Sequence, residues 1–399
     1  MTAKRPHVAI LGAGPVGLEA ALAADAAGVP FTVFEQADAP GAAVAEWGHV
    51  RLFSPWDLDV SPRQRRALEA AGAEVPAGAA CPTGRELVDR VLAPVAALPE
   101  VAPHLALGTR VVAVGREGLI KHREIATPAR AARPFRLLVA DAAGERVEHA
   151  DVVLDCTGTW GQPNWLGDGG IPAVGESALG GEIRRHLPDF AAEAGEWAGR
   201  TVLLAGSGHS AQTAVCALAE LAAARPGTRV VWAVNDPLPP PIEDDPLPER
   251  ARLARRAGEL AEGLSAAVEA VPGARVDRMR RNGRGIYVSL QRPDGRREEV
   301  LADRILSLTG YVGDHALHRQ LQVHQCYATE GPMKLSAALL GAAGGDCLVP
   351  GGHGVDTLKN PEPGFFLLGS KSYGRNNTFL MRAGWQQVDE VFGELAAAR

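Results

Sequence analysis

Short apolar runs flank an alanine-rich segment at the start of the chain. Val8 to Leu11 is a continuous apolar run, and Phe31 to Phe34 is a second one, interrupted only by a threonine. Runs of this length are typical of strands that are buried on both faces of a parallel sheet. The segment from about Leu18 to Ala27 predicts a helix between them. The order strand, helix, strand predicts the beginning of a parallel α/β sheet.

A glycine-rich turn joins the first strand to this helix. It reads Gly12-Ala-Gly-Pro-Val-Gly17, the spacing of a dinucleotide-binding fingerprint. In that fingerprint the first glycine allows the tight turn, the second lets a pyrophosphate approach bare backbone, and the third lets the helix lie close to the strand. We expect Gly12, Gly14, Pro15, Val16 and Gly17 to contact the pyrophosphate at the helix N-terminus. Glu35 ends the next strand, where an acidic residue binds the ribose hydroxyls, and Gln36 follows it.

The second half of the chain repeats this pattern. Thr201 to Ala205 predicts a strand, Gln212 to Ala224 a helix, and Arg229 to Val234 the next strand. The turn between the first two ends on Ala211, and a small residue is sufficient at that position. Two such units predict two dinucleotides bound side by side, which hydride transfer requires. The expected contacts of the second nucleotide are Gly206, Ser207, Gly208, His209 and Ser210, with Asn235 after the last strand.

Each unit is followed by a predicted hairpin and a buried strand that returns to the sheet. The first hairpin joins 135–139 to 146–149, and its return strand ends at Thr157-Gly158. The second joins 285–290 to 298–301, and its return strand ends at Thr309-Gly310-Tyr311. Other predicted elements are a strand over 109–114, a helix starting near Pro82, a helix over 249–270, a strand over 364–369, a helix over 379–395, and loops over 36–44 and 237–248.

Composition narrows the function classes. The chain has 399 residues, 46% of them hydrophobic and 22% charged, and a mean hydropathy of -0.04, as expected for a soluble globular protein. A net charge of -6 gives no basis for nucleic-acid binding. No stretch is apolar enough to span a membrane, so we expect a cytoplasmic protein. The five cysteines are scattered and include no CxxC pair. This pattern argues against a disulfide framework, against a metal site and against a redox dithiol.

Taken together, the two glycine turns and the two Thr-Gly strand ends resemble the two-dinucleotide-binding flavoproteins. Within these, the chain is most similar to the flavin-containing monooxygenase group, which includes N-hydroxylating and Baeyer–Villiger relatives. The resemblance covers nearly the whole chain. It implies an α/β fold with two Rossmann-like domains, each with a β-hairpin insertion, the second domain inserted into the first. The implied FAD-binding domain covers residues 1–160 and 305–399, and the NAD(P)-binding domain covers residues 161–304.

The resemblance also implies a reaction. FAD would be reduced by NADPH or NADH and would react with molecular oxygen, and a C4a-hydroperoxyflavin would then oxygenate a small molecule at nitrogen, at sulfur or at a ketone. The residues are also compatible with two alternative functions. The first is a flavin reductase or dehydrogenase of similar architecture that does not activate oxygen, and the second is a flavin-bound sensor with a weakened nicotinamide site. The oligomeric state is also open, and a homodimer is one expectation.

Two positions depart from the pattern of the resembled group. Its histidine fingerprint is matched only in part by Gly181 to Phe190, in which His186 has the expected distance from the aromatic residue. NADPH-specific members usually carry Arg or Lys after the strand that follows the second glycine turn, where this chain has Asn235-Asp236. The expectation is therefore NADPH held by an arginine from the 250–256 segment, or else NADH.

Further site residues follow from the resemblance. Val112, with Val111, would flank the adenine, and Thr157, Gly158 and Gly310 would lie at the strand ends that face the cofactors. The isoalloxazine would lie near Trp47, Arg51 and Ser54 and near the Gly369-Ser370 turn. Donor-rich loops at these places suggest Ser54, Arg375 and Asn376 as the catalytic candidates.

Overall fold

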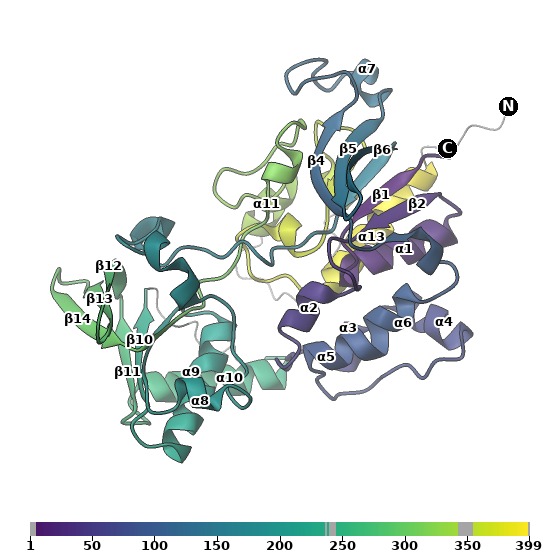
Figure 1. Ribbon diagram of the computed structural model, residues 1–399. Coiled ribbons are helices and arrows are strands. Elements are labelled where there is room, and N and C mark those ends of the chain that lie inside the picture. The colour runs from purple at the N-terminus through teal and green to yellow at the C-terminus, as the bar shows by residue number, and fades with distance from the viewer. Residues whose placement is uncertain (1–4, 236–237, 239–244, 342–353, 398–399) are drawn as a thin grey trace. The chain divides into compact units, whose positions relative to one another are not determined.

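The computed structural model describes residues 5–235, 238, 245–341 and 354–397. The chain divides into two compact units. Figure 1 colours the chain by residue number, so that the segments of each unit can be found by their colour. Unit 1 comprises Met1–Gln162 and Val312–Arg399, and unit 2 comprises Pro163–Tyr311. The second unit is thus inserted into the first, as predicted.

Unit 1 is built on a five-stranded parallel sheet. Its strand order is β16 (Phe365–Leu367), β7 (Val152–Asp155), β1 (Val8–Leu11), β2 (Phe31–Phe34) and β3 (Leu105–Ala106). Because all neighbouring strands run parallel, their carboxyl ends meet at one edge of the sheet. The turns that follow β1, β2, β7 and β16 are therefore brought together, and ligands of open α/β sheets bind at this edge.

The two faces of this sheet are covered by different layers. Ala9 and Leu11 pack against the antiparallel sheet of β4 (Arg110–Arg116), β5 (Phe135–Asp141) and β6 (Gly144–Ala150). Val8 and Ile10 point to the other face and join the core that holds α1 (Pro15–Ala26) and α13 (Met381–Ala397). Because both faces are buried, β1 is a continuous apolar run rather than an alternating one.

The remaining helices of unit 1 are short. The helix predicted near Pro82 begins at α5 (Gly84–Leu87), where Thr83 and Glu86 form a capping box. It continues through a π-helical turn (Val88–Leu92) into α6 (Ala93–Ala96). The segment predicted as a loop after Gln36 includes the short helix α2. The bounds are α2 (Ala42–Glu46), α3 (Trp56–Asp59), α4 (Pro62–Ala70), α6 (Ala93–Ala96), α7 (Pro128–Ala131), α11 (Met333–Gly341) and α12 (Val355–Leu358).

Unit 2 repeats the layered plan. Its parallel sheet has the order β11 (Val268–Pro272), β10 (Arg229–Val234), β9 (Thr201–Ala205), β15 (Arg304–Ser307) and β8 (Ile183–Arg184). An antiparallel sheet shares a hydrophobic core with this sheet, and its strands are β12 (Arg275–Asn282), β13 (Gly285–Gln291) and β14 (Arg297–Ala302). The helices are α8 (Ala194–Trp197), α9 (His209–Ala224), which packs on β9 and β10, and α10 (Pro248–Ala261), which packs on α9.

Three expectations differ from this structure. The helix predicted over 249–270 ends at Ala261, because Gly263 takes a φ of +98° and the following residues pair with β10 as β11. The second predicted hairpin has a third strand, β12, on its other side. The predicted domain boundary at residue 305 falls inside β15, which pairs with β9, so unit 2 extends to Tyr311. Asp236 and most of the loop predicted after it lie outside the described residues.

Candidate functional site

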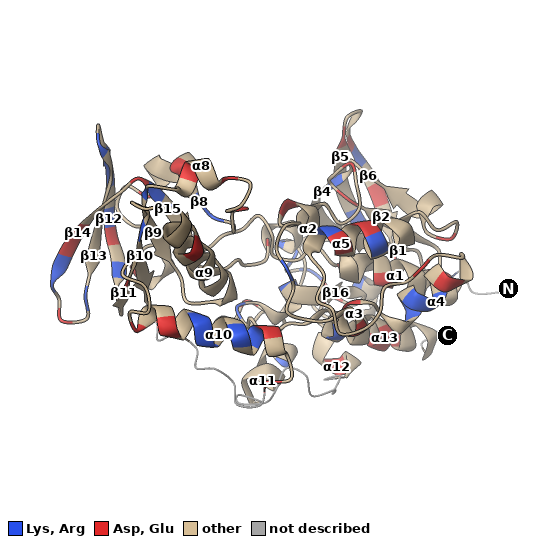
Figure 2. Cartoon of the chain, turned by 90° about the horizontal axis from the view of Figure 1, so that it is seen from below, with Lys and Arg blue, Asp and Glu red and all other residues tan. Residues whose placement is uncertain are grey.

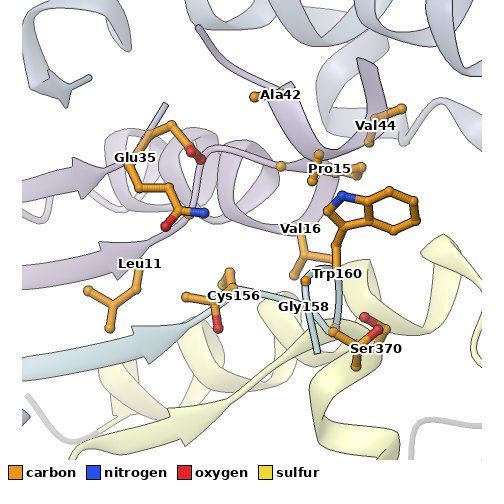
Figure 3. A pocket seen from close by; sticks show the side chains of 18 of the residues that line it. Leu11, Pro15, Val16, Glu35, Ala42, Val44, Cys156, Gly158, Trp160 and Ser370 are labelled. Atoms are coloured by element: carbon orange, nitrogen blue, oxygen red, sulfur yellow. The ribbon is translucent and has the colours of Figure 1, made fainter. Parts of the chain in front are cut away.

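A cavity of about 730 Å³ lies in unit 1, where the carboxyl ends of β1, β2 and β7 meet. The first glycine turn, the end of β2 and the turns after β7 and β16 contribute to its wall, and Figure 3 shows part of this lining. Twelve of the residues predicted to bind FAD line it: Gly12, Gly14, Pro15, Val16, Glu35, Gln36, Trp47, Val112, Thr157, Gly158, Gly369 and Ser370.

The three glycines of the first turn meet different surroundings. Gly12 has a φ of +96°, and a Cβ there would lie 3.0 Å from the carbonyl oxygen of Cys156. A Cβ on Gly17 would lie 1.8 Å from the carbonyl oxygen of Gly12, so only glycine lets the helix approach the strand this closely. A Cβ on Gly14 would meet no protein atom within 4 Å. The first and third glycines therefore serve the fold, whereas the space beside the second is open to a ligand.

The N-terminus of α1 faces the same cavity. Gly14 is its N-cap and offers no side-chain cap, and Pro15 is the first helical residue. The first-turn N–H groups of a helix have no partner within the helix, and they carry its positive dipole end. Pro15 and Val16 both line the cavity. This wall is therefore suited to an anion such as a pyrophosphate.

Glu35 is fixed at the end of β2 by two backbone donors. Ala13 N–H donates to Oε2 at 2.8 Å, and Ala37 N–H donates to Oε1 at 3.0 Å. The carboxylate is thereby held beside the glycine turn, and each oxygen keeps a lone pair for a further donor. Glu35 lines the cavity, so its position suits the hydroxyl groups of a ribose.

On the other side of the cavity, a buried ion pair supports the turn after β7. Lys371 Nζ donates to Asp155 Oδ2 at 2.7 Å and to Thr157 Oγ1 at 3.1 Å. Thr157 Oγ1 in turn donates to Asp155 Oδ1 at 2.6 Å. Burial alone would raise the pKa of Asp155, but the neighbouring charges of Lys371 and His318 hold that pKa well below its usual value. The ionised cluster fixes Thr157 and Gly158 at the wall of the cavity.

Some lining residues were not predicted from the sequence. Trp160 lines the cavity, and its Nε1 donates to Glu46 Oε2 at 2.8 Å. Because Trp160 comes only two residues after the predicted residue Gly158, its position in the sequence could have identified it as a lining residue. Other unpredicted lining residues belong to segments with no motif of their own, and examples are Ala42, Val44, Thr109, Asp314, Leu317, Phe379 and Met381.

Five residues predicted for this site are not part of the cavity lining. Gly17 instead lies close to the carbonyl oxygen of Gly12, where there is no room for a Cβ. The guanidinium of Arg51 donates to the carbonyl of Cys81, and Ser54 Oγ donates to Asp59 Oδ1 at 2.6 Å in a buried position. Arg375 donates to Glu330 at 3.1 Å, and Asn376 accepts hydrogen bonds from Thr378. These contacts give Ser54, Arg375 and Asn376 structural partners away from the cavity wall.

The second glycine turn has the same geometry in unit 2. Gly206 has a φ of +127°, and a Cβ there would lie 2.3 Å from the carbonyl oxygen of Leu308. Gly208 is the N-cap of α9 without a side-chain cap, and His209 is the first helical residue. The turn therefore presents Gly206, Ser207, Gly208, His209 and Ser210 in the arrangement of an anion-binding helix start.

The other residues predicted for the second nucleotide lie at neighbouring strand ends of unit 2. Asn235 follows β10 and is exposed, and Gly310 follows β15 with a φ of +84°. His186 is half-buried after β8, and Phe190, the aromatic residue of its fingerprint, packs against Trp197 at a ring distance of 5.3 Å. The structure thus gives Phe190 a place in the core of unit 2.

Cysteines and metal-binding groups do not form a redox or metal centre in the described part of the chain. The four cysteines described there are free, and Cys347 lies outside it. Cys156 lines the cavity, but burial raises the pKa of its thiol. The described residues contain no group of three His, Cys, Asp or Glu that could hold a metal ion. None of the described helices has the length and hydropathy that a membrane crossing requires.

Comparisons with known proteins agree with this geometry. No protein-family model and no curated protein matches the sequence. Solved structures match over the full chain: a bacillithiol disulfide reductase from Bacillus cereus (TM-score 0.66, 19% identity, 99% of this chain and 100% of that one); an ornithine N-hydroxylase from Kutzneria sp. 744 (0.62, 16%, 99% of both); and a flavin-containing monooxygenase from Stenotrophomonas maltophilia (0.59, 18%, 99% of both). The predicted fold class is confirmed: the chain has the fold of the FAD- and NAD(P)-binding flavoproteins with two dinucleotide-binding domains.

Proposed function

We propose that the protein is an FAD-dependent oxidoreductase that uses a nicotinamide nucleotide and oxygenates a small molecule. The observation that carries the proposal is the cavity of about 730 Å³, whose walls combine an uncapped helix start, the open space at Gly14 and the fixed carboxylate of Glu35. This combination fits a dinucleotide, which needs an anion site and a diol acceptor about 20 residues apart in sequence. Unit 1 is the proposed FAD-binding domain and unit 2 the proposed nicotinamide-nucleotide domain.

Each wall of the cavity has a role in this proposal. The Gly12–Gly17 turn binds the pyrophosphate, Glu35 binds the adenosine ribose, and Val112 flanks the adenine. The turns at Thr157-Gly158 and Gly369-Ser370 hold the remainder of the cofactor, and the buried Lys371–Asp155 pair keeps the first of these turns in place. When bound, FAD supplies hydride acceptance and the reaction with oxygen. The chain contributes binding, orientation and the exclusion of water.

The state of the cysteines favours oxygenation over a dithiol reaction. Solved structures of this fold include both monooxygenases and disulfide reductases. A dithiol reductase needs two cysteines that form a disulfide with each other, and at least one of low pKa. The described cysteines are free, the sequence has no CxxC pair, and the thiol that lines the cavity has a raised pKa. Hydrogen bonding with Thr329 lowers the pKa of Cys326, but Cys326 does not line the cavity. The substrate class that we propose, a soft nucleophile at nitrogen or sulfur or a ketone, comes from the resemblance to the flavin-containing monooxygenase group.

A reductase that does not oxygenate is the second candidate. The similarity to bacillithiol disulfide reductases over 99% of the chain favours it. Such an enzyme would pass electrons from the nicotinamide nucleotide through flavin to an acceptor, without inserting oxygen.

The proposal is tested with the purified full-length protein. It is expected to carry FAD, to be bleached by NADH or NADPH without air, and then to transfer one atom of ¹⁸O₂ to an amine, a thioether or a ketone from a panel, as read by mass spectrometry. Reduction of a disulfide panel with all oxygen returned as hydrogen peroxide would support the reductase instead. A protein that binds FAD but is not bleached by either nucleotide would be a sensor, and a protein that takes up no FAD would refute the proposal.

A further inference from the structure

The residues after β10 bear on which nicotinamide nucleotide unit 2 accepts. In strand–turn–helix units of this kind, the end of the second strand meets the adenosine ribose, where an arginine accommodates a 2′-phosphate and an acidic or neutral acceptor binds a free 2′-hydroxyl. Here β10 ends at Val234, and the next residue, Asn235, is exposed and uncharged. The sequence from Asn235 to Pro248 contains four acidic residues and no Lys, Arg or His. The described end of β10 therefore offers a 2′-phosphate no positive charge, and the next arginine in the sequence is Arg250.

The first cation after this stretch is already neutralised. Arg250 lies near the start of α10, and Asp245 accepts from its Nε at 2.8 Å and from its Nη2 at 2.7 Å. The two side chains are 8% and 1% exposed. A guanidinium held by two bonds in a nearly buried position has its charge compensated. Moving it to a phosphate would leave the buried carboxylate of Asp245 without its partner, which is costly.

His209 does not supply the missing charge. It is the first residue of α9 and is close enough to Arg250 and Asp245 for both charges to act on it. Burial first, and then the positive charge of Arg250, lower the pKa of His209, while Asp245 opposes this. The imidazole is therefore neutral at neutral pH, and it offers hydrogen bonds but no charge to a nucleotide.

The other arginines of α10 balance much of their charge within the helix. Figure 2 shows that α10 carries both signs along its length. Arg252 pairs with Glu249 at 2.9 Å, and Arg256 pairs with Glu259 at 3.3 Å. Arg255 is exposed on the same helix. It is therefore the arginine whose removal tests whether α10 reaches a 2′-phosphate.

We propose that unit 2 selects NADH over NADPH. The inference rests on the proposed function of unit 2 as the nicotinamide-nucleotide domain. Asn235 hydrogen-bonds the free 2′-hydroxyl of the adenosine ribose, and the pairing with Asp245 keeps Arg250 from binding a 2′-phosphate. NADPH is disfavoured because its 2′-phosphate would gain no charge from Asn235 and would have to compete with Asp245 for Arg250.

Direct binding to the full-length protein tests this without a catalytic readout. Calorimetry compares ADP-ribose with 2′-phospho-ADP-ribose, two probes that differ only in the 2′-phosphate. ADP-ribose is expected to bind at least about tenfold more tightly. Equal binding, or tighter binding of the phosphorylated probe, would overturn the selectivity and leave the proposed function standing. If neither probe binds, the proposed function of unit 2 fails, and the selectivity fails with it.

Three variants sharpen the test. Asn235→Arg is expected to raise the affinity for 2′-phospho-ADP-ribose about tenfold while changing that for ADP-ribose little, because it adds a cation at the end of β10. Asn235→Gln is the matched control without the charge and is expected to leave the preference in place. Arg255→Ser is expected to change neither affinity. A selective loss of 2′-phospho-ADP-ribose binding in Arg255→Ser would show that α10 reaches the phosphate, and it would overturn the proposal.

Discussion

Lys371 Nζ lies 2.7 Å from Asp155 Oδ2, and both side chains are completely buried. Their partners come from three segments that are distant in sequence. Asp155 ends β7, Lys371 follows the Gly369-Ser370 turn, and His318 Nδ1 lies 3.7 Å from the same carboxylate oxygen. Because Lys371 also donates to Thr157, the pair links two turns that line the cavity. One charge pair thus fixes both the fold and the proposed FAD site.

Lys371→Met is expected to destabilise the protein by about 3–5 kcal/mol, because it leaves the Asp155 carboxylate buried without its main counter-charge. Urea unfolding followed by fluorescence measures this. The double variant Lys371→Met/Asp155→Asn removes the uncompensated charge as well and is expected to recover much of the loss. Lys359→Met is the control, since Lys359 is partly exposed and pairs with Glu394 and Asp356 near the surface; its expected cost is below about 1 kcal/mol. A single variant no less stable than this control would contradict the assigned role.

Gly14→Val separates cofactor binding from folding. The backbone of Gly14 has a φ of -84° and a ψ of -171°, which valine adopts easily, and a Cβ there meets no protein atom within 4 Å. The variant is expected to fold, to lose about 1 kcal/mol at the helix N-cap, and to purify without yellow colour because its side chain fills the proposed pyrophosphate site. FAD content per chain and circular dichroism measure the two effects.

The matched change is Gly17→Ala, five positions after Gly12 in the same turn. Its smaller side chain would lie 1.8 Å from the Gly12 carbonyl oxygen, so it is expected to cost stability, about 1–3 kcal/mol or more. The smaller substitution should therefore damage the fold more than the larger one. Retention of full FAD content by Gly14→Val would refute the placement of the pyrophosphate.

Asp59 makes the stability of unit 1 depend on pH. Its side chain is 2% exposed, Ser54 donates to Oδ1, and no described group hydrogen-bonds Oδ2. Burial raises the pKa of Asp59 from 3.8 to about 7, against the opposing effect of the Ser54 hydrogen bond. Between these two values the folded state holds a proton that the unfolded state has released. The contribution of Asp59 to stability is therefore fully present below pH 4 and is lost as the pH rises towards 7.

The unfolding free energy of the wild type is expected to contain a component that falls by up to about 1.4 kcal/mol per pH unit in this window. Asp59→Asn keeps a neutral group of the same shape and is expected to remove that component, so that it is more stable than the wild type at pH 8. Denaturant unfolding at a series of pH values measures both proteins. If the two curves stay parallel from pH 4 to 8, Asp59 does not titrate in this range.

The elements that could be predicted from the sequence are those whose local geometry restricts which residues are allowed. β1, α1 and β2 follow from an apolar run, three glycines and a terminal acid, because each glycine position has a steric reason that any chain with this fold must meet. The second turn followed for the same reason. These rules predicted Gly12, Gly14, Pro15, Val16, Glu35 and Gln36, all of which line the cavity. The other six predicted residues that line it were expected from the family resemblance: Trp47, Val112, Thr157, Gly158, Gly369 and Ser370.

What could not be predicted depends on contacts between distant segments. From the sequence, Ser54 was predicted to be a loop hydrogen-bond donor near the flavin. In the structure its hydroxyl donates to Asp59 in the buried part of unit 1. Arg375 pairs with Glu330, which is 45 residues away in the sequence. The 249–270 segment has helical composition throughout, yet its end pairs with β10 as a strand. Such choices are decided by packing, which overrides local propensity.

The hydrogen bond between Trp160 and Glu46 joins two residues that line the cavity, and we expect it to slow the release of FAD. Trp160 follows β7, Glu46 ends α2, and both line the cavity, where Figure 3 labels Trp160. FAD bound along the first glycine turn, as proposed, would share the cavity with this contact, and we expect the contact to slow its dissociation. Trp160→Phe keeps an aromatic ring but removes the N–H donor. It is expected to speed FAD dissociation about fivefold, the change that a hydrogen bond of about 1 kcal/mol produces.

The recovery of FAD fluorescence after dilution of the loaded protein measures this rate. Glu46→Gln is the matched variant, because its amide oxygen still accepts from the indole and the exposed position tolerates the loss of charge. It is expected to release FAD at close to the wild-type rate, whereas Glu46→Ala should behave like Trp160→Phe. If Trp160→Phe and Glu46→Ala each release FAD at the wild-type rate, the contact does not restrain the cofactor. If they accelerate release by the same factor and the double variant adds nothing further, the two side chains act as one closure on the cavity.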